Sequence, residues 1–348
     1  MANSVAKRVD YIDLLRIIAI TFVAIFHFLY SAIVNNKTPS LSPSPLFETA
    51  RYGYLGVELF FMISGYVVVA TVQRSNFIDF LRKRFLRLYP MYWIALVLIF
   101  AISSLGIWKK AGPAAQTFYS NLTMFPKTFN EPWIDNAHWF MERQLQLYLA
   151  LSLVLLLRLG KRIELIFTYW AIIGFVWHQF GIENFNIWYL NGYFALISGG
   201  ALIAIIRTHG FNLLRVLALL ASFLWAIETR MAKVDWFNSS RSPGYSKTTI
   251  GLVVTAIYLL MLISLIPKIS TLKLSWAVKA GVVTYPFYLI HDRVGGLILG
   301  RFATEGNKYF MYLTVIALAV GLARIIMRIE SKLFSLFTFP RTKSRLAE

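Results

Sequence analysis

The 348-residue chain contains no cysteine. Disulfide bonds, thiolate metal sites and cysteine nucleophiles are therefore excluded. Charged residues are also scarce, at 15% of the sequence, which is too few to give a soluble protein of this size a normal polar surface. Acidic residues are the scarcer kind, with 16 against 35 basic residues. These shortages argue against a soluble fold.

Apolar residues take their place, at 58% of the chain with a mean hydropathy of +0.61. A helix needs ~20 apolar residues to cross a hydrocarbon core of ~30 Å, and about ten stretches are long enough. The sequence predicts an all-α, polytopic integral membrane protein, with one transmembrane domain over residues 1–348 and no additional soluble domain. The predicted spans cover about 12–329 and lie near residues 12–34, 54–73, 88–107, 139–157, 163–180, 187–206, 211–228, 248–267, 282–300 and 309–329.

Basic residues in the connecting segments predict the orientation. With the N-terminus in the cytoplasm, the inner segments hold about twice as many lysines and arginines as the outer loops, which is the usual bias. We therefore expect a multi-pass membrane protein with both termini cytoplasmic. The main exception is the predicted outer loop 229–247, whose basic excess is either a feature that faces substrate or a tolerated exception. Its charged residues are Arg230, Lys233, Asp235, Arg241 and Lys247.

The net charge of +19 fits a protein whose inner loops are basic and contact anionic membrane lipids. Nucleic acid is not an expected partner, because the basic residues are spread over several loops and no recognition fold is visible.

Arg16 and His27 lie within the first predicted span. A helix rises ~1.5 Å and turns ~100° per residue, so these two residues are ~16 Å apart and within ~20° of the same face. A charge that faces lipid costs ~2.5 to 3.5 kcal/mol, so this face is expected to meet protein or water. In the alternative interpretation Asp13 simply pairs with Arg16 at the interface, and His27 is a neutral histidine of the core.

Four basic residues precede the third predicted span. Arg84 and Arg87 are three residues apart and share a helical face, and a pair of planar guanidinium groups suits a phosphate or pyrophosphate. Alternatively, the cluster anchors the protein at lipid head groups. Pro90 is expected near the first turn of the span. The full cluster is Arg82, Lys83, Arg84 and Arg87.

Other polar residues lie at or near membrane depth. Glu58 of the second span either reaches the interface or joins the cavity that His27 faces. At the start of the fourth span His138 and Glu142 are four apart and can meet on one face. In the ninth span, Asp292 pairs either with its neighbour Arg293 or with groups on other helices.

Four segments together resemble the membrane-bound acyltransferase-3 family, and the resemblance runs from about residue 10 to residue 330. Its most specific element is an arginine followed, after ten residues, by a histidine, as in Arg16 and His27. A second element is Arg-x-x-Arg before a proline, as in Arg84 and Arg87. The segments are DLLRIIAITFVAIFH, GYLGVELFFMISGYVV, RKRFLRLYPMYW and TYPFYLIH.

The resemblance implies a ten-helix carbohydrate O-acyltransferase. Such an enzyme takes an acyl group, commonly acetyl, from cytosolic acyl-CoA and passes it to a hydroxyl of a carbohydrate, free or lipid-linked. Lipopolysaccharide O-antigen and exopolysaccharide are the expected kinds of polysaccharide, and O-acetylation from acetyl-CoA is the expected reaction, without a metal. The resemblance also implies that His27 is catalytic and that Arg84 and Arg87 bind the donor.

This sequence departs from the family pattern at the fourth span. Many members have WSLSVEEQFY there, whereas HWFMERQLQLYL places Gln144 at the position of the first of those glutamates and moves the acid to Glu142. Many members also carry an extracytoplasmic SGNH domain, which is not expected here.

Acyl transfer from a thioester needs a base for the hydroxyl and a positive group for the developing oxyanion. We predict that His27 is the base, that Arg16 steers the thioester and that Asp13 orients Arg16, with Glu142 as a further catalytic candidate. Direct transfer and a transient acyl-histidine both remain open. The predicted donor-binding residues are Arg82, Lys83, Arg84 and Arg87, and the predicted supporting residues are Glu58, His138, Tyr288 and His291.

Two other functions fit part of the pattern. A polytopic transporter or flippase of a polysaccharide pathway would use His27, Glu58, His291 and Asp292 as a proton path. A scaffold of an assembly complex would tolerate replacement of all these residues. Cleavage of a thioester by the purified protein separates the three.

Overall fold

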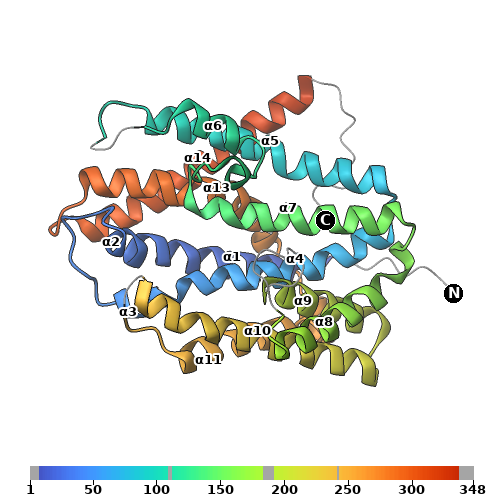
Figure 1. Ribbon diagram of the computed structural model, residues 1–348. Coiled ribbons are helices and arrows are strands. Elements are labelled where there is room, and N and C mark those ends of the chain that lie inside the picture. The colour runs from blue at the N-terminus through green and yellow to red at the C-terminus, as the bar shows by residue number, and fades with distance from the viewer. Residues whose placement is uncertain (1–7, 109–111, 183–191, 241–242, 337–348) are drawn as a thin grey trace.

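The computed structural model describes residues 8–108, 112–182, 192–240 and 243–336, and every regular element in these ranges is a helix (Figure 1). The prediction of an all-α, polytopic membrane protein is confirmed. Five segments are long and apolar enough to cross a membrane by length and composition. They are Asp10–Val34, Phe47–Gln73, Phe77–Ser103, Gly192–His209 and Lys308–Ser335.

Long helices follow one another in the order of the predicted spans. The first comprises α1 (Asp10–Ile25), the π-helical η1 (Phe26–Ser31) and α2 (Ala32–Val34). The others are α4 (Gly56–Gln73), α5 (Phe77–Ser103), α7 (Trp139–Leu156), α8 (Ile163–Gln179), α9 (Gly192–His209), α10 (Leu213–Ser240), α11 (Lys247–Ile263), α13 (Ser275–Phe302) and α14 (Lys308–Leu336). Short connecting helices are α3 (Phe47–Ala50), η2 (Arg51–Leu55), α6 (Ala115–Asn121), η3 (Pro126–Phe129), η4 (Asn136–His138), η5 (Gly160–Arg162) and α12 (Pro267–Ser270).

The helices α1 and α4 run side by side through the middle of the molecule (Figure 1). The helices α5, α7, α13 and α14 lie on one side of this pair, and α8 to α11 lie on the other. Glycines allow α4 to pack closely on α9, because a Cβ at Gly65 would meet the carbonyl group of Ile197 and a Cβ at Gly200 would meet that of Met62. Small residues at such crossings are typical of helix packing in membranes.

Two predicted helix boundaries are wrong. The helix α5 begins at Phe77, after Asn76 caps it by accepting a hydrogen bond of 2.8 Å from the Asp79 amide, so Pro90 lies inside the helix rather than in its first turn. A polar side chain of this kind satisfies an amide that the helix leaves open. The helix α10 continues to Ser240, so most of the predicted loop 229–247 is helical. Arg241 and residues 187–191 lie outside the described residues.

The π-helical segment η1 interrupts the first long helix at His27. A π-helix closes its hydrogen bonds over one more residue than an α-helix and occurs mostly as single turns, often at functional sites. The extra residue changes the direction in which side chains leave the helix.

Candidate active site

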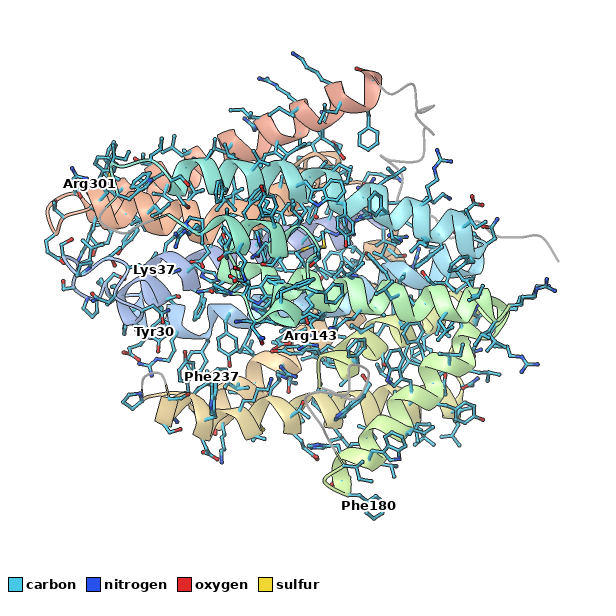
Figure 2. All side chains as sticks on the ribbon, turned by 45° about the horizontal axis from the view of Figure 1, so that its top comes forward. Tyr30, Lys37, Arg143, Phe180, Phe237 and Arg301 are labelled. Atoms are coloured by element: carbon cyan, nitrogen blue, oxygen red, sulfur yellow. The ribbon has the colours of Figure 1, made fainter. Side chains whose placement is uncertain are left out.

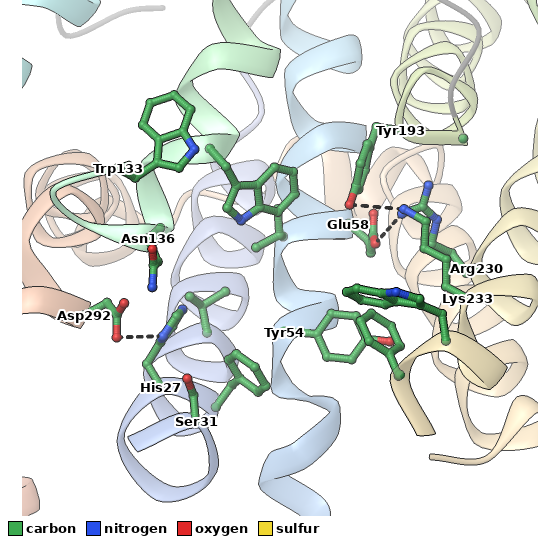
Figure 3. A pocket seen from close by; sticks show the side chains of 18 of the residues that line it. His27, Ser31, Tyr54, Glu58, Trp133, Asn136, Tyr193, Arg230, Lys233 and Asp292 are labelled. Atoms are coloured by element: carbon green, nitrogen blue, oxygen red, sulfur yellow. Dashed lines mark hydrogen bonds and ion pairs between the residues drawn. The ribbon is translucent and has the colours of Figure 1, made fainter. Parts of the chain in front are cut away.

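A cavity of about 870 Å³ lies where η1, α4, α9, α10, α13 and the segment before α7 meet (Figure 3). Polar groups occupy two ends of it, with His27 and Asp292 on one side and Glu58, Arg230, Tyr193 and Lys233 on the other. The polar and charged residues that line it are His27, Ser31, Asn35, Tyr54, Glu58, Asn136, Tyr193, Thr229, Arg230, Lys233, Tyr288 and Asp292.

His27 and Asp292 form the first polar end. The Asp292 Oδ1 atom lies 2.9 Å from His27 Nδ1 and 2.5 Å from Lys37 Nζ. Lys37 lies toward the end of the bundle that also holds Arg301 (Figure 2). The Nδ1 atom of His27 is at ion-pair distance but is not aligned for a hydrogen bond, as is common in active sites before substrate binds. A carboxylate at Nδ1 leaves Nε2 as the nitrogen that can react.

His291 and Tyr288, both predicted as supporting residues, lie directly behind this pair. The ring of His291 is nearly perpendicular to that of His27, with 4.9 Å between the ring centroids. His291 is fully buried, and its Nδ1 lies 2.8 Å from the carbonyl oxygen of Tyr288. The Tyr288 hydroxyl donates to the carbonyl of Ala137 at 2.5 Å and so joins α13 to η4. These contacts hold the His27 side of the cavity in place.

The predicted contact between His138 and Glu142 is wrong. His138 is fully buried, and its Nε2 lies 2.7 Å from the carbonyl of Leu289 on α13. Glu142 instead accepts a hydrogen bond of 3.1 Å from Gln146 and lines neither cavity described here. Gln144, at the position of the family glutamate, is buried and accepts a hydrogen bond of 2.6 Å from Ser64. His138 and Gln144 therefore contact neighbouring helices, whereas Glu142 pairs within α7.

Glu58 and Arg230 form the second polar end. Arg230 Nη1 lies 3.2 Å from Glu58 Oε1, and both side chains are buried. The Arg230 guanidinium lies over the ring of Tyr193 at 4.1 Å from its centroid, and Lys233 Nζ lies 4.6 Å from the same centroid. Of the two positions considered for Glu58, the cavity is the one observed. The basic excess of segment 229–247 was the signal in the sequence for Arg230 and Lys233.

Aromatic side chains make up much of the remaining wall. Trp133 and Tyr54 are seen beside the two polar ends (Figure 3). Wide aromatic surfaces with a few polar groups are typical of pockets for small organic ligands. The aromatic residues that line the cavity are Phe26, Tyr54, Trp133, Trp139, Tyr193, Trp236, Phe237 and Tyr288.

A second cavity, of about 150 Å³, lies at the other end of α1. Asp13 holds Arg16 there through a contact of 2.6 Å and Arg8 through one of 2.7 Å, so the expected pairing of Asp13 with Arg16 is confirmed. The charged residues that line this cavity are Arg8, Asp13, Arg16, Arg74, Lys83 and Arg207. An excess of cations of this kind suits an anionic ligand such as a phosphate.

The four predicted donor-binding residues of α5 are placed differently from one another. Lys83 lines the second cavity, whereas Arg82 and Arg87 are exposed at the surface. Arg84 is buried, with its guanidinium 5.3 Å from the ring centroid of Phe80 and 5.2 Å from that of Tyr148. Arg84 and Arg87 therefore do not form one accessible face.

Arg74 and Arg207 line the second cavity but were not among the site residues predicted from the sequence. Each is a cation directly after an apolar stretch that ends on the side predicted to be cytoplasmic. That position was a usable signal, although it is shared by every ordinary interfacial arginine.

Arg16 and His27 belong to different cavities. The two cavities have no lining residue in common within the described part of the chain, so Arg16 and His27 do not open onto one shared cavity. Along α1 and α4 the positions between the cavities hold buried apolar side chains, including Ala19, Phe61 and Met62. Close packing of this layer separates the two sites.

Comparison with known proteins gives one result that covers nearly the whole chain. A family model described as an acyltransferase domain, of the acyltransferase 3 type, matches residues 9–328. No curated protein and no solved structure matches the chain.

Proposed function

Given that this chain belongs to the acyltransferase 3 family and is therefore a membrane acyltransferase, we propose that it O-acetylates a cell-surface carbohydrate with acetyl-CoA as the donor. A polysaccharide such as O-antigen or exopolysaccharide, free or lipid-linked, is the proposed acceptor. The observation that carries the proposal is the contact of 2.9 Å between His27 and Asp292 at the edge of a large cavity.

His27 acts as the general base in this proposal. Its Nε2 takes the proton of the acceptor hydroxyl, and the oxygen forms a bond to the thioester carbonyl carbon. When the tetrahedral intermediate collapses, the carbon–sulfur bond breaks and the proton moves from the imidazolium to the departing thiolate. The products are the O-acetyl ester and free CoA. Asp292 stabilises the imidazolium that forms in between and fixes the ring by its contact at Nδ1.

The oxyanion of the tetrahedral intermediate needs a donor close to His27. Asn136 lines the same cavity, and its side chain lies on the side of His27 and Asp292 (Figure 3). We assign the side-chain amide of Asn136 as the hydrogen-bond donor to this oxyanion. Arg16, predicted to act near the thioester, lies in the second cavity and is assigned to the donor instead.

The second cavity is the proposed site of the CoA phosphates. Its cations include Arg16, Arg74, Lys83 and Arg207, against the single carboxylate of Asp13. Arg82, Arg84 and Arg87 do not line this cavity and are kept as donor residues on the family resemblance alone. The acyl chain must pass the layer of Ala19 and Met62 to reach His27, so donor binding has to separate α1 from α4 at this layer.

The proposed orientation places both termini in the cytoplasm, in the inner (plasma) membrane of a bacterium. The bias of basic residues toward the inner segments supports this orientation. It puts the cavity of Arg16 on the cytosolic side, where acetyl-CoA is made, and the cavity of His27 toward the opposite side.

Purified protein in lipid nanodiscs tests the proposal. With acetyl-CoA and extracted surface polysaccharide, the protein should release CoA and form O-acetyl groups that are visible by NMR. His27→Ala should abolish both, whereas His209→Ala, at an exposed histidine outside both cavities, should change neither. Solute flux without CoA release would support a transporter in place of an enzyme. A scaffold would be supported if cells that lack this protein lose surface O-acetylation and the His27→Ala protein restores it.

A further inference from the structure

Among the residues that the structure describes, the second polar end of the large cavity contains more positive than negative charge. Arg230 and Lys233 both line it, on successive turns of α10, and Glu58 is the acid that faces them. The other acid in the cavity wall, Asp292, is held on the opposite side by His27 and Lys37. A positive excess inside a predominantly apolar membrane domain is costly unless a ligand or partner compensates it.

Pairing with Glu58 does not use the full hydrogen-bonding capacity of Arg230. The contact with Glu58 uses Nη1, while Nε is buried and has no hydrogen-bond acceptor among the described residues. The second carboxylate oxygen of Glu58, Oε2, is likewise buried without a donor in the same part of the chain. Buried polar atoms are normally satisfied, so this end has the features of a site that a polar ligand completes.

We propose that Arg230 and Lys233 bind an anionic group, a carboxylate or a phosphate, of the carbohydrate acceptor. This inference rests on the proposed function, because it concerns the acceptor of the same cavity. A guanidinium can hold two oxygens of such a group in its plane. The acceptor is then an acidic sugar. Its charged group lies at Arg230, and the hydroxyl to be acylated faces His27 on the other side of the cavity.

The aromatic wall fits the rest of such an acceptor. Trp133, Trp139 and Trp236 line the cavity. A pyranose ring has apolar C–H faces that pack on indole and phenol rings, and its hydroxyls need the few polar groups available. Charge recognition at one end and aromatic packing along the wall would select an acidic sugar over a neutral one.

The CoA phosphates are the competing anion. Their proposed site is the second cavity, which is separated from this one by the buried layer around Ala19 and Met62. Competition experiments with 3′,5′-ADP, which carries the nucleotide phosphates of CoA without its thioester, therefore distinguish the two sources of negative charge.

Binding to the full-length protein in phosphatidylcholine nanodiscs tests the inference. The probes are methyl β-D-glucuronide, methyl β-D-glucoside 6-phosphate and the neutral methyl β-D-glucoside, titrated against intrinsic tryptophan fluorescence. At least one of the two anionic probes should bind tenfold or more tighter than the neutral one, which corresponds to ~1.4 kcal/mol. The probe that does so identifies carboxylate or phosphate as the recognised group.

Variants test whether Arg230 and Lys233 cause the preference for anionic probes. Lys233→Gln should reduce the ratio between anionic and neutral probes at least about threefold, and Arg230→Lys, which keeps the charge but loses the planar fork, should reduce it as well. Lys247→Gln is the matched control, because it removes the same charge from an exposed ion pair with Asp235 outside the cavity. It should leave the ratio unchanged.

Three results would overturn the inference. They are equal or undetectable binding of the anionic probes, a ratio that both cavity variants leave intact, and displacement of the glucuronide by 3′,5′-ADP. Release of CoA is measured in the same samples. Acetyl transfer without preference for acidic sugars would refute the inference and keep the proposed function. Anion-selective binding without any thioester cleavage would refute the proposed function and keep the anion-binding site.

Discussion

Replacement of Asp292 by Asn tests the central pair of the proposed mechanism. Asn has the same shape, so the change removes a charge and leaves the packing intact. Asp292 contacts two nitrogen atoms through the same oxygen, with His27 Nδ1 at 2.9 Å and Lys37 Nζ at 2.5 Å. The two nitrogens therefore lie at most ~5.4 Å apart. The variant should leave Lys37 repelling the imidazolium with no carboxylate between them.

Coulomb's law gives the size of the effect. At an effective dielectric constant of ~20, the carboxylate at 2.9 Å stabilises an imidazolium by about 6 kcal/mol, and Lys37 at ~5.4 Å opposes this by about 3 kcal/mol. Asp292→Asn should therefore lower kcat by roughly 10⁴, since ~1.4 kcal/mol is a factor of ten. Adding Lys37→Met to this variant removes the repulsion and should recover roughly 10² of the lost rate.

The assay is initial CoA release at saturating acetyl-CoA and acceptor, with equal amounts of folded protein confirmed by thermal denaturation. Asp235→Asn and its double variant with Lys247→Met change an exposed ion pair with a comparable separation of 2.8 Å and should both retain the wild-type rate. The electrostatic argument fails if Asp292→Asn keeps more than about a tenth of the activity. It also fails if the double variant is no faster than the single one.

Three further predictions concern the donor site, the helix packing and the pH dependence of stability. Arg207→Gln should raise KM for acetyl-CoA about tenfold with kcat unchanged in steady-state kinetics, because one charge-assisted contact to a phosphate is lost. Gly65→Ala places a methyl group against the Ile197 carbonyl and should destabilise the protein by ~1 to 3 kcal/mol in a denaturant titration. Lys308 lowers the pKa of Glu305 from 4.5 to about 2, so its carboxylate stabilises the fold above about pH 4.5 and loses this effect as the pH falls toward 2. Glu305→Gln should accordingly lower Tm at pH 7, by an amount that shrinks below about pH 4.5.

The controls for these three changes are matched in kind. Arg215→Gln removes an arginine that pairs with Glu164 outside both cavities and should leave KM unchanged, so an equal rise in both variants would exclude a specific donor contact. Gly321→Ala adds a methyl group where no atom lies within 4 Å and should not destabilise. A Tm difference for Glu305→Gln that is constant across the pH range would contradict the assigned pKa.

Much of the fold follows from the sequence because a membrane imposes a simple requirement. Each crossing needs a long apolar helix, and the order of the long helices agrees with the apolar stretches. Helix ends were less predictable, since hydropathy records where a helix leaves lipid and not where its hydrogen bonds end. The basic start of α5 and the charged end of α10 were assigned to connecting segments for this reason.

The contacts within the candidate site were only partly predictable. Periodicity placed Arg16 and His27 on one helix and the family pattern marked both, yet a buried apolar layer puts them in separate cavities. Arg84 matched a phosphate-binding pattern, but tertiary packing buries it between aromatic rings.

The sequence by itself determined that this is a helical membrane protein and to which family it belongs, because apolar length and short motifs are local properties of the chain. The tertiary structure decided which charges meet. Asp292 reaches Lys37 across 255 residues, and Arg230 reaches Glu58 across 172. Spacing within one helix fixes the face on which a charge lies, but the partner on that face depends on which helices pack together.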